Sequence, residues 1–302
     1  MAESPFPRQL VEPNALRALK QRHNLPGLLH LAGHAALLVL SAALVGAVRG
    51  GPWLVPALLV HGVVLVFLFP PLHEAVHETA FRNRAANRLT ALLCGSLLVL
   101  PPRWFRAYHF DHHLYTQDPA RDPELAAAKP VSPLGYIVHV SGLPYWTERL
   151  TTVVRYATGR PPNETFVPPG RRAPLIAEAR RFLLAYALLA ALAIAGGWWD
   201  EALLLGAALL LGQPVLRLFL MAEHSGCETG PDMLRNSRTT RSNPFVRWLA
   251  WNMPYHVEHH AYPWVPYHAL PAAHQAIAGH GQVTARSYLE VHREMLRGFR
   301  CG

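Results

Sequence analysis

The chain has 302 residues, of which 51% are hydrophobic and only 16% are charged. This composition is too apolar for an average soluble domain, and the length allows several membrane spans. The net charge of +9 comes almost entirely from arginine, since Lys20 and Lys129 are the only lysines. The arginines lie in the segments between apolar runs, which favours membrane orientation or docking of an acidic partner over binding of nucleic acid.

The three cysteines are too scattered to form a structural framework. Cys94, Cys227 and Cys301 form no Cys-x-x-Cys pair, so we expect neither disulfides nor a zinc ribbon. We also expect the soluble parts of the chain to face a reducing compartment. The first 27 residues are polar and charged, without a short apolar core and a small-residue cleavage site. This pattern argues against a cleavable signal peptide, so the first apolar run is expected to remain as a membrane anchor.

Four apolar runs approach the ~20 residues that a membrane-spanning helix needs. Tight links at residues 49–52 and 196–201 join them in pairs, and a long polar segment separates the two pairs. The sequence therefore predicts an all-α polytopic membrane protein of one domain, residues 1–302, with four transmembrane helices in two hairpins. The expected spans are residues 28–48, 53–71, 182–197 and 202–221.

The distribution of charge predicts how these spans are oriented. Arginine is abundant in segments 1–27, 72–181 and 222–302, whereas the two short links contain one arginine together with Asp200 and Glu201. Under the positive-inside rule, both termini and the middle segment face the cytoplasm. We expect an integral protein of the inner (cytoplasmic) membrane of a bacterium, with the three arginine-rich segments forming a cytoplasmic helical cap.

Two weaker apolar stretches lie within the middle segment. Residues 90–100 are too few to span a bilayer and are followed by Pro101 and Pro102, which favours a re-entrant or buried helix. Residues 133–154 mix aromatic and polar side chains, as a helix lying along the membrane surface does.

Eight of the 18 histidines fall into three short motifs on the predicted cytoplasmic side. Positions i and i+3 or i+4 share a helix face, so each motif directs at least two imidazoles the same way. Neutral imidazole suits iron, zinc, copper and nickel. Eight such ligands are more than one tetrahedral ion uses, so we expect two metal ions in the cap. The three histidine boxes are His73/His77, His109/His112/His113 and His256/His259/His260.

The first histidine box has a competing interpretation. Residues 73–77 also match H-E-x-x-H, the zinc protease motif in which Glu74 would be the general base. Such a site needs three protein ligands and an open position, so it has no use for the other two boxes. A soluble-type di-iron carboxylate bundle is also disfavoured, because it needs two Glu-x-x-His motifs and only Glu74-x-x-His77 is suitably placed.

The order of these boxes in a four-span protein resembles the membrane fatty acid desaturases. That superfamily also includes alkane, sterol and carotenoid hydroxylases, so the motif set is more specific for the superfamily than for desaturation. The resemblance covers about residues 30–275. Flanking residues strengthen it, namely Arg103-Trp104-Phe105-Arg106, Asp118-Pro119-Ala120-Arg121-Asp122-Pro123 and the run from Tyr255 to Pro263.

The resemblance implies two iron ions, dioxygen as co-substrate, and a site of nine histidines with one weaker ligand. His224, just past the fourth expected span, has the right position for the ninth histidine. Asn252, four residues before His256, would be the weaker ligand and would reach a metal ion through a water molecule. Alternatively, Asn252 is the N-cap of a helix whose first turn contains Pro254.

Acidic residues are interleaved with the box histidines. Asp111 and Glu258 would accept hydrogen bonds from the second ring nitrogens of metal-bound imidazoles, although both also suit solvated helix faces. His34 and His61 lie inside the first two expected spans. There we expect neutral imidazoles that are hydrogen-bonded between helices.

These expectations define a reaction and its partners. An oxygen-dependent desaturase would introduce a double bond into a fatty acyl or other lipid chain. A hydroxylase or ketolase of the same superfamily, acting on a carotenoid, an alkane or another apolar molecule, is the alternative, and the zinc metalloprotease is a distant one. The partners would be the lipid bilayer, the lipid substrate and an external, ferredoxin-like electron donor docked near Arg103, Arg106 and Arg121.

Overall fold

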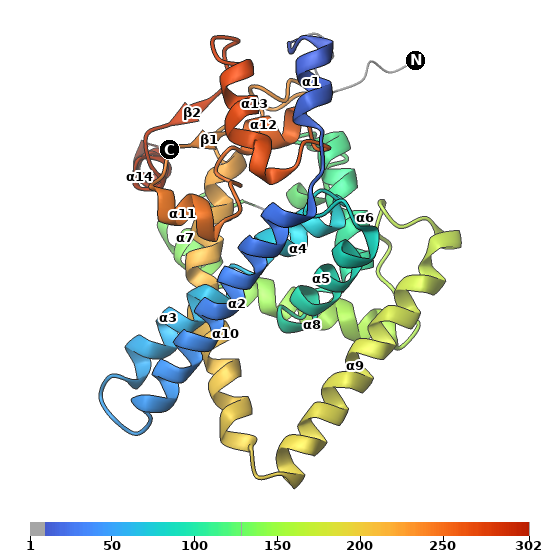
Figure 1. Ribbon diagram of the computed structural model, residues 1–302, viewed down its shortest axis with the longest axis vertical. Helices are drawn as coiled ribbons and strands as arrows, with labels where there is room; N and C mark the ends of the chain where they lie inside the picture. Colours follow the sequence, from blue (N-terminus) through green and yellow to red (C-terminus); the bar gives the residue numbers. More distant parts are fainter. Residues whose placement is uncertain (1–9, 128, 302) are drawn as a thin grey trace.

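The structure is a computed structural model that describes residues 10–127 and 129–301. Its described part is mostly helical, as expected, with one parallel pair of two-residue strands (Figure 1). The α-helices are α1 (Pro13–Leu19), α2 (Asn24–Ala47), α3 (Leu54–Val66), α4 (Phe69–Val76), α5 (Arg84–Leu97), α6 (Pro102–Tyr115), α7 (Pro133–Val140), α8 (Leu143–Ala157), α9 (Arg172–Ala195), α10 (Trp199–His224), α11 (Pro244–Leu249), α12 (His256–Ala261), α13 (Leu270–Ala276) and α14 (Tyr288–Cys301). The short elements are η1 (Pro123–Ala126), η2 (Pro169–Arg171), η3 (Tyr267–Ala269), β1 (Thr239–Thr240) and β2 (Thr284–Ala285).

Three helical segments in the described part are long and apolar enough to cross a bilayer. They are Asn24–Ala47, Leu54–Val76 and Trp199–His224. The first is α2, the second combines α3 and α4, and the third is α10. The expected spans at 28–48, 53–71 and 202–221 therefore correspond to apolar helices.

The remaining expected span, residues 182–197, begins halfway along α9. The first half of α9 carries Glu178, Arg180 and Arg181, and the helix is not among the segments that are apolar enough to span. A different fourth candidate is the pair α5 and α6, which bends by 100° and is either a broken span or a re-entrant loop. The two-hairpin, four-span arrangement stays a prediction.

Helices α3 and α10 pack with their backbones almost in contact. A Cβ atom added to Gly62 would lie 2.0 Å from the carbonyl oxygen of Ala208, and one added to Gly212 would lie 2.1 Å from the carbonyl oxygen of Gly62. Small residues at such a crossing let two apolar helices approach closely. This crossing fixes α10 against the helix that leads into α4.

His34 and His61 are hydrogen-bonded between helices, as expected. Nε2 of His34 on α2 lies 2.9 Å from the carbonyl oxygen of Val64 on α3. Nδ1 of His61 on α3 lies 2.8 Å from Oγ of Ser41 on α2. Both imidazoles therefore join α2 to α3 and have no part in the histidine boxes.

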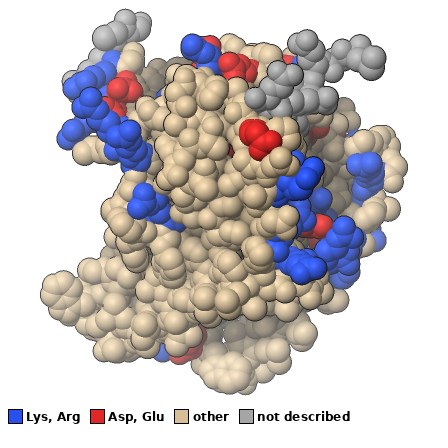
Figure 2. All heavy atoms as spheres, turned by 45° about the horizontal axis from the view of Figure 1, so that its top comes forward, with Lys and Arg blue, Asp and Glu red and all other residues tan. Residues whose placement is uncertain are grey.

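Charged side chains gather at one end of the molecule. On the face drawn in Figure 2, lysine, arginine and acidic groups lie mostly in the upper and middle parts, and the lower part is nearly uncharged. The α2–α3 and α9–α10 connections lie at the lower ends of Figure 1, whereas α4, α6 and α12 lie above them. A buried apolar cluster that includes Phe67, Leu216, Phe219, Val257 and Leu270 joins the upper ends of α3 and α10 to α12 and α13.

Candidate metal centre

The structure brings together nine histidines from four helices. His73 lies on α4 and His77 at its C-cap, three lie on α6, His224 is the last residue of α10, and three lie on α12. All except His77, which is partly buried, are buried. The three boxes and His224 thus form one site, although they span 188 positions of the sequence from 73 to 260.

The first histidine cluster contains five imidazoles whose nitrogens lie within 4.8 Å of one another: His73, His77, His109, His113 and His259. Nε2 of His109 lies 2.9 Å from Nε2 of His77. Nε2 of His113 lies 3.0 Å from Nε2 of His109 and 3.0 Å from Nε2 of His259. Ring nitrogens that converge in this way cannot all be paired by hydrogen bonds, because a neutral imidazole has one N–H donor.

The second histidine cluster contains His112, His224, His256 and His260. Nitrogens of His112, His224 and His260 lie within 4.8 Å of one another. Nε2 of His224 lies 3.3 Å from Nε2 of His112 and 2.9 Å from Nε2 of His256. His260 has a buried Nε2 without a hydrogen-bond partner among the described residues.

The two adjacent-histidine pairs explain why two clusters form side by side. On α6, His113 belongs to the first cluster and His112 to the second. On α12, His259 belongs to the first and His260 to the second. Neighbouring residues on a helix point about 100° apart, so each pair directs one imidazole to each cluster. The H-x-x-H-H spacing therefore lets α6 and α12 each contribute to both clusters, which α4 and α10 complete.

The nitrogen geometry fits metal ions. Two ligands at right angles around an ion, each at the ~2.1 Å of a metal–imidazole bond, lie roughly 3.0 Å apart. The nitrogen separations of 2.9–3.3 Å in both clusters agree with this value. Burial also lowers the pKa of His256, His259 and His260 well below the ordinary value, and neighbouring histidines lower it further. Their rings are therefore neutral, as metal coordination requires.

Glu74 lies behind two ligands of the first cluster. Its Oε1 is 3.7 Å from Nδ1 of His73 and 4.0 Å from Nδ1 of His259. Its Oε2 accepts hydrogen bonds from Oγ1 of Thr79 at 2.7 Å and from the backbone N–H of Tyr267 at 3.2 Å. Oε1 of Glu74 forms no hydrogen bond within the described residues, but it is a buried acceptor near both Nδ1 atoms, the position from which a carboxylate can support metal-bound imidazoles.

Asp122, Glu124 and Glu223 lie beside the second cluster. Nδ1 of His112 donates to Oδ1 of Asp122 at 2.9 Å, which directs Nε2 of that ring towards the cluster. Oε2 of Glu124 lies 3.3 Å from this Nε2, on the cluster side of the ring. Oε1 of Glu223 lies 3.4 Å from Nδ1 of His256. Histidine ligands backed by carboxylates are typical of metal centres.

Comparison with known proteins agrees with this geometry. The family model described as fatty acid desaturase matches residues 50–288. The chain belongs to the fatty acid desaturase family. All nine clustered histidines lie within the matched residues, so the metal centre belongs to the part of the chain that defines family membership.

One curated relative of this desaturase-family chain is sphingolipid delta(4)-desaturase DES1 of Drosophila melanogaster. The two sequences are 27% identical over 226 residues, which cover 70% of this chain and 61% of the relative. The match therefore spans less than two thirds of the relative's length. Family membership indicates an oxidoreductase, and together with the apolar helices it indicates a membrane protein.

Three residues that the sequence suggests as site residues have side chains that, within the described residues, make no hydrogen bond or ion pair with the clustered histidines, namely Asn252, Glu258 and Asp111. Nδ2 of Asn252 donates to the carbonyl oxygen of Tyr267 at 3.1 Å, and the N-cap of α12 is Tyr255 rather than Asn252. Glu258 accepts from Oγ1 of Thr239 at 2.5 Å and contacts Nδ1 of His274 at 2.6 Å.

Asp111 is partly exposed on α6. Within the described residues, neither its carboxylate nor that of Glu258 contacts an imidazole of the two clusters.

Sequence reasoning missed the carboxylates that do contact the clusters. Asp122 and Glu124 follow the second box by about ten residues, in a turn whose shape depends on Asp122 accepting from the N–H groups of Gln117 and Glu124. An aspartate before a proline, as at Asp122, indicates a turn. A turn directly after a histidine box reverses the chain, so that side chains of the turn can contact the box. Glu74 is one of the acidic residues interleaved with the boxes, but the sequence favours Asp111 and Glu258 over it for a contact with the imidazoles.

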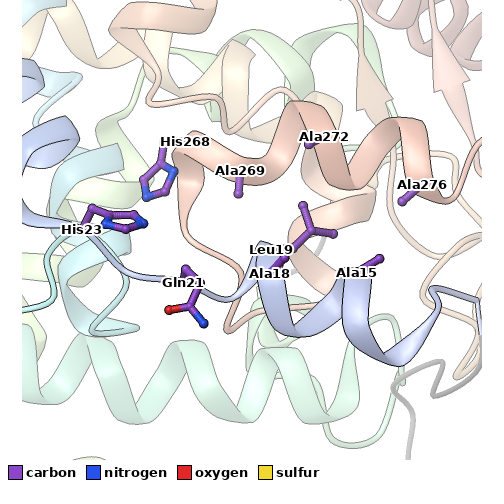
Figure 3. A pocket seen from close by; sticks show the side chains of 9 residues that line it. All are labelled: Ala15, Ala18, Leu19, Gln21, His23, His268, Ala269, Ala272 and Ala276. Atoms are coloured by element: carbon purple, nitrogen blue, oxygen red, sulfur yellow. The ribbon is translucent and has the colours of Figure 1, made fainter.

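A hollow beside α1 lies outside the candidate metal centre. It has a volume of about 560 Å³ and lies between α1 and the η3–α13 segment (Figure 3). Small side chains, including Ala18 and Ala272, line most of it, and His23 and His268 face each other at one end with ring centroids 6.0 Å apart. Neither histidine belongs to the two clusters.

Proposed function

We propose that this chain is an oxygen-dependent membrane desaturase that introduces a double bond into a fatty acyl or other lipid chain at two histidine-bound iron ions. The observation that carries the proposal is the division of each His-His pair between two adjacent, buried imidazole clusters. Membership of the fatty acid desaturase family supports the same reaction class. The whole chain would act as a single domain.

Nine protein ligands and their supports suit this chemistry. The first ion would be bound by His73, His77, His109, His113 and His259, and the second by His112, His224, His256 and His260. The iron centre would supply the activation of dioxygen. In the overall reaction, dioxygen would be reduced to two water molecules by two hydrogens from the substrate together with two electrons, which the external donor supplies, and two protons. Imidazole is a good ligand for iron, and Asn252 remains a weaker candidate that would act through water.

The chain's own residues would hold this centre in place and keep it dry. Asp122 fixes the tautomer of His112 by accepting from its Nδ1, and Glu74 would do the same for His73 and His259. Phe105 stacks on His109 with ring centroids 5.2 Å apart, and Trp104 and Phe105 are buried. Apolar walls of this kind exclude water from a reactive metal site.

A hydroxylase or ketolase acting on a carotenoid, an alkane or another apolar molecule remains the second candidate, because such enzymes would use the same ligand set. The sphingolipid desaturase relative favours desaturation of a lipid. The zinc protease is a poor fit. Its general base would have to face the metal ion, whereas Oε1 of Glu74 lies at the outward-facing Nδ1 atoms of His73 and His259.

The proposed setting is the inner membrane of a bacterium, with both termini and the metal centre in the cytoplasm. Arg49 pairs with Asp200 and Glu201 at 2.9 and 2.6 Å, which ties together the two links expected on the opposite side. An external, ferredoxin-like donor would dock on the arginine-rich side. Arg103 and Arg121 support such docking, because their side chains are 59% and 61% exposed.

Lipid analysis of cells tests the proposed reaction. The intact chain and its His109→Ala variant are expressed at equal levels in a host that supplies a ferredoxin-like donor, and total lipids are analysed by mass spectrometry. We expect species two mass units lighter with the intact chain only, which corresponds to loss of two hydrogens. Species 16 mass units heavier in their place would establish hydroxylation instead.

A further inference from the structure

Arg149, which is buried, and Arg217, which is half-buried, form no ion pair shorter than 3.9 Å within the described residues, although Glu164 lies near the first and Glu124 and Glu223 lie near the second. The side chain of Arg149 on α8 is 6% exposed, and its nearest acid is Glu148, whose Oε1 is 3.9 Å away and whose own side chain is 60% exposed. Nε and Nη1 of Arg149 and Nε of Arg217 on α10 are buried without a hydrogen-bond partner in the described residues. Guanidinium groups keep their charge in proteins, so the charge of Arg149 is held away from water and that of Arg217, which is half-buried, is partly shielded from it.

The two guanidinium groups meet at one aromatic ring. The Cζ atom of Arg217 lies 4.3 Å from the ring centroid of Tyr145, and the Cζ atom of Arg149 lies 5.8 Å from the same centroid. Arg149 also lies 3.9 Å from the ring centroid of Trp104. Aromatic faces attract cations but do not neutralise them. Two like charges beside one ring repel each other until an anion lies between them.

Two further buried polar atoms that lack hydrogen-bond partners within the described residues lie on the same two helices. Among the residues that the structure describes, Nε1 of Trp146, next to Tyr145 on α8, is buried and has no hydrogen-bond partner. The same holds for Oε1 of Gln213, one turn before Arg217 on α10. The two helices are in contact here, because a Cβ added to Gly142 would lie 2.5 Å from Cγ of Gln213. Buried polar atoms are nearly always paired, so this group of side chains is built to face a polar ligand.

This arginine pair lies beside the metal centre but not in it. Arg217 precedes His224 by seven residues on α10, which is two helical turns or about 10 Å along the axis. Glu124, which contacts His112, and Tyr108 lie close enough to Arg217 to act on its charge. A group held by the arginine pair would therefore lie a short and fixed distance from the second histidine cluster.

We propose that Arg149 and Arg217 bind the anionic head group, a carboxylate or a phosphate, of a substrate with an apolar tail. The term substrate rests on the proposed function. An anion between the two guanidinium groups neutralises both charges and supplies acceptors for the unpaired N–H donors. A neutral head group supplies no negative charge opposite either guanidinium group. The pair then sets which carbon of the tail reaches the metal centre.

Ligand binding to the intact, iron-loaded chain in an uncharged detergent tests this proposal. Displacement of radiolabelled palmitate is measured with three competitors of equal tail length, namely palmitate, hexadecyl phosphate and 1-hexadecanol, and with inorganic phosphate alone. We expect one of the two anions to bind roughly 10- to 100-fold more tightly than the alcohol, and the tighter one identifies the head group. Equal binding of the alcohol overturns the proposal, as does inorganic phosphate competing as well as hexadecyl phosphate.

Two variants connect this preference to the arginines. Arg149→Gln and Arg217→Gln are each expected to lose most of the preference for the anion while binding 1-hexadecanol as before. Arg155→Gln is the matched control, because it removes the same charge from an exposed position on the same helix. If Arg149→Gln does not fold, the half-buried Arg217 still provides the test. An unchanged preference in the Arg217 variant overturns the proposal.

Binding needs no turnover, so this inference and the proposed function can fail separately. Anion preference that depends on the arginines, in a chain that forms no double bonds, would refute the desaturase and leave the anion site intact. If the chain forms double bonds but shows no preference for anions, the anion site is refuted and the desaturase is supported.

Discussion

Nδ1 of His112 donates to Oδ1 of Asp122 across 2.9 Å, and both side chains are buried. This carboxylate is held in turn by the N–H groups of Gln117 and Glu124 at 2.8 and 2.9 Å. The orientation of a ligand in the second histidine cluster is therefore set by a turn outside the histidine boxes.

Asp122→Asn removes the charge that orients His112, so the second ion of the proposed di-iron centre should be held more weakly. Loss of such a supporting carboxylate typically lowers metal affinity about 10- to 100-fold. Iron retained by the purified protein against increasing chelator measures the effect. Asp118→Asn is the control, because Asp118 lies in the same turn and pairs instead with the exposed Arg121. Equal iron retention by both variants would refute the role of Asp122.

Glu124 is expected to contribute to the second metal site directly. Its Oε2 lies 3.3 Å from Nε2 of His112, a separation that suits two ligands of one ion. Glu124→Ala should lower the iron content from about two towards about one per chain and change one of the two Mössbauer signals. Glu148→Ala is the control, because Glu148 is largely exposed and contacts none of the nine histidines. A variant spectrum identical to that of the unaltered chain would exclude Glu124 as a ligand.

The close crossing of α3 and α10 makes a specific prediction about stability. Gly62→Ala places a methyl group 2.0 Å from the carbonyl oxygen of Ala208, so the helices must separate. Overpacking of this kind typically costs about 1–3 kcal/mol. Thermal unfolding in detergent should show a lower midpoint for this variant. Gly46→Ala on α2, where nothing lies within 4 Å, should leave the midpoint unchanged or raise it.

Glu178 makes stability depend on pH. Burial raises its pKa from the ordinary 4.5 to about 7, although the backbone N–H of Arg103 donates to it at the start of α6. The folded state therefore binds the proton more tightly than the unfolded state. Stability contributed by this group is complete below pH 4.5 and declines as the pH rises towards 7.

Glu178→Gln should flatten that decline, because an amide keeps an acceptor oxygen and has no charge to bury. Unfolding midpoints of the two proteins, measured from pH 4.5 to 8, should diverge in favour of the variant as the pH rises. Parallel curves would mean that Glu178 has the same pKa in both states.

The sequence was most informative where helical spacing alone places ligands. Seven of the eight box histidines, and His224, are buried, and all nine meet in the two clusters. The i+3 and i+4 offsets predict which histidines of one box share a helix face, whereas His224 was expected only because the chain resembles the membrane fatty acid desaturases. The inter-helix roles of His34 and His61 were also predictable, because an imidazole inside an apolar helix needs a polar partner.

Tertiary contacts explain what the sequence did not reveal. Glu258 occupies a box position but turns to Thr239 and His274, and nothing in the box spacing specifies those partners. Asp122 acts through a turn, and turn geometry depends on several backbone hydrogen bonds at once. The bounds of the expected span at 182–197 also depend on more than the local sequence. The helix is continuous from Arg172 to Ala195, and hydropathy alone does not set where a membrane begins along it.

The metal content of the purified chain tests the central claim most directly. Iron and zinc are quantified per chain for the unaltered protein, for His113→Ala in the first cluster and for His260→Ala in the second. We expect about two iron ions in the unaltered chain and a loss of iron in each variant, because each cluster holds its own ion. A single zinc ion that both variants retain would contradict the account, since such an ion would depend on His73 and His77 alone.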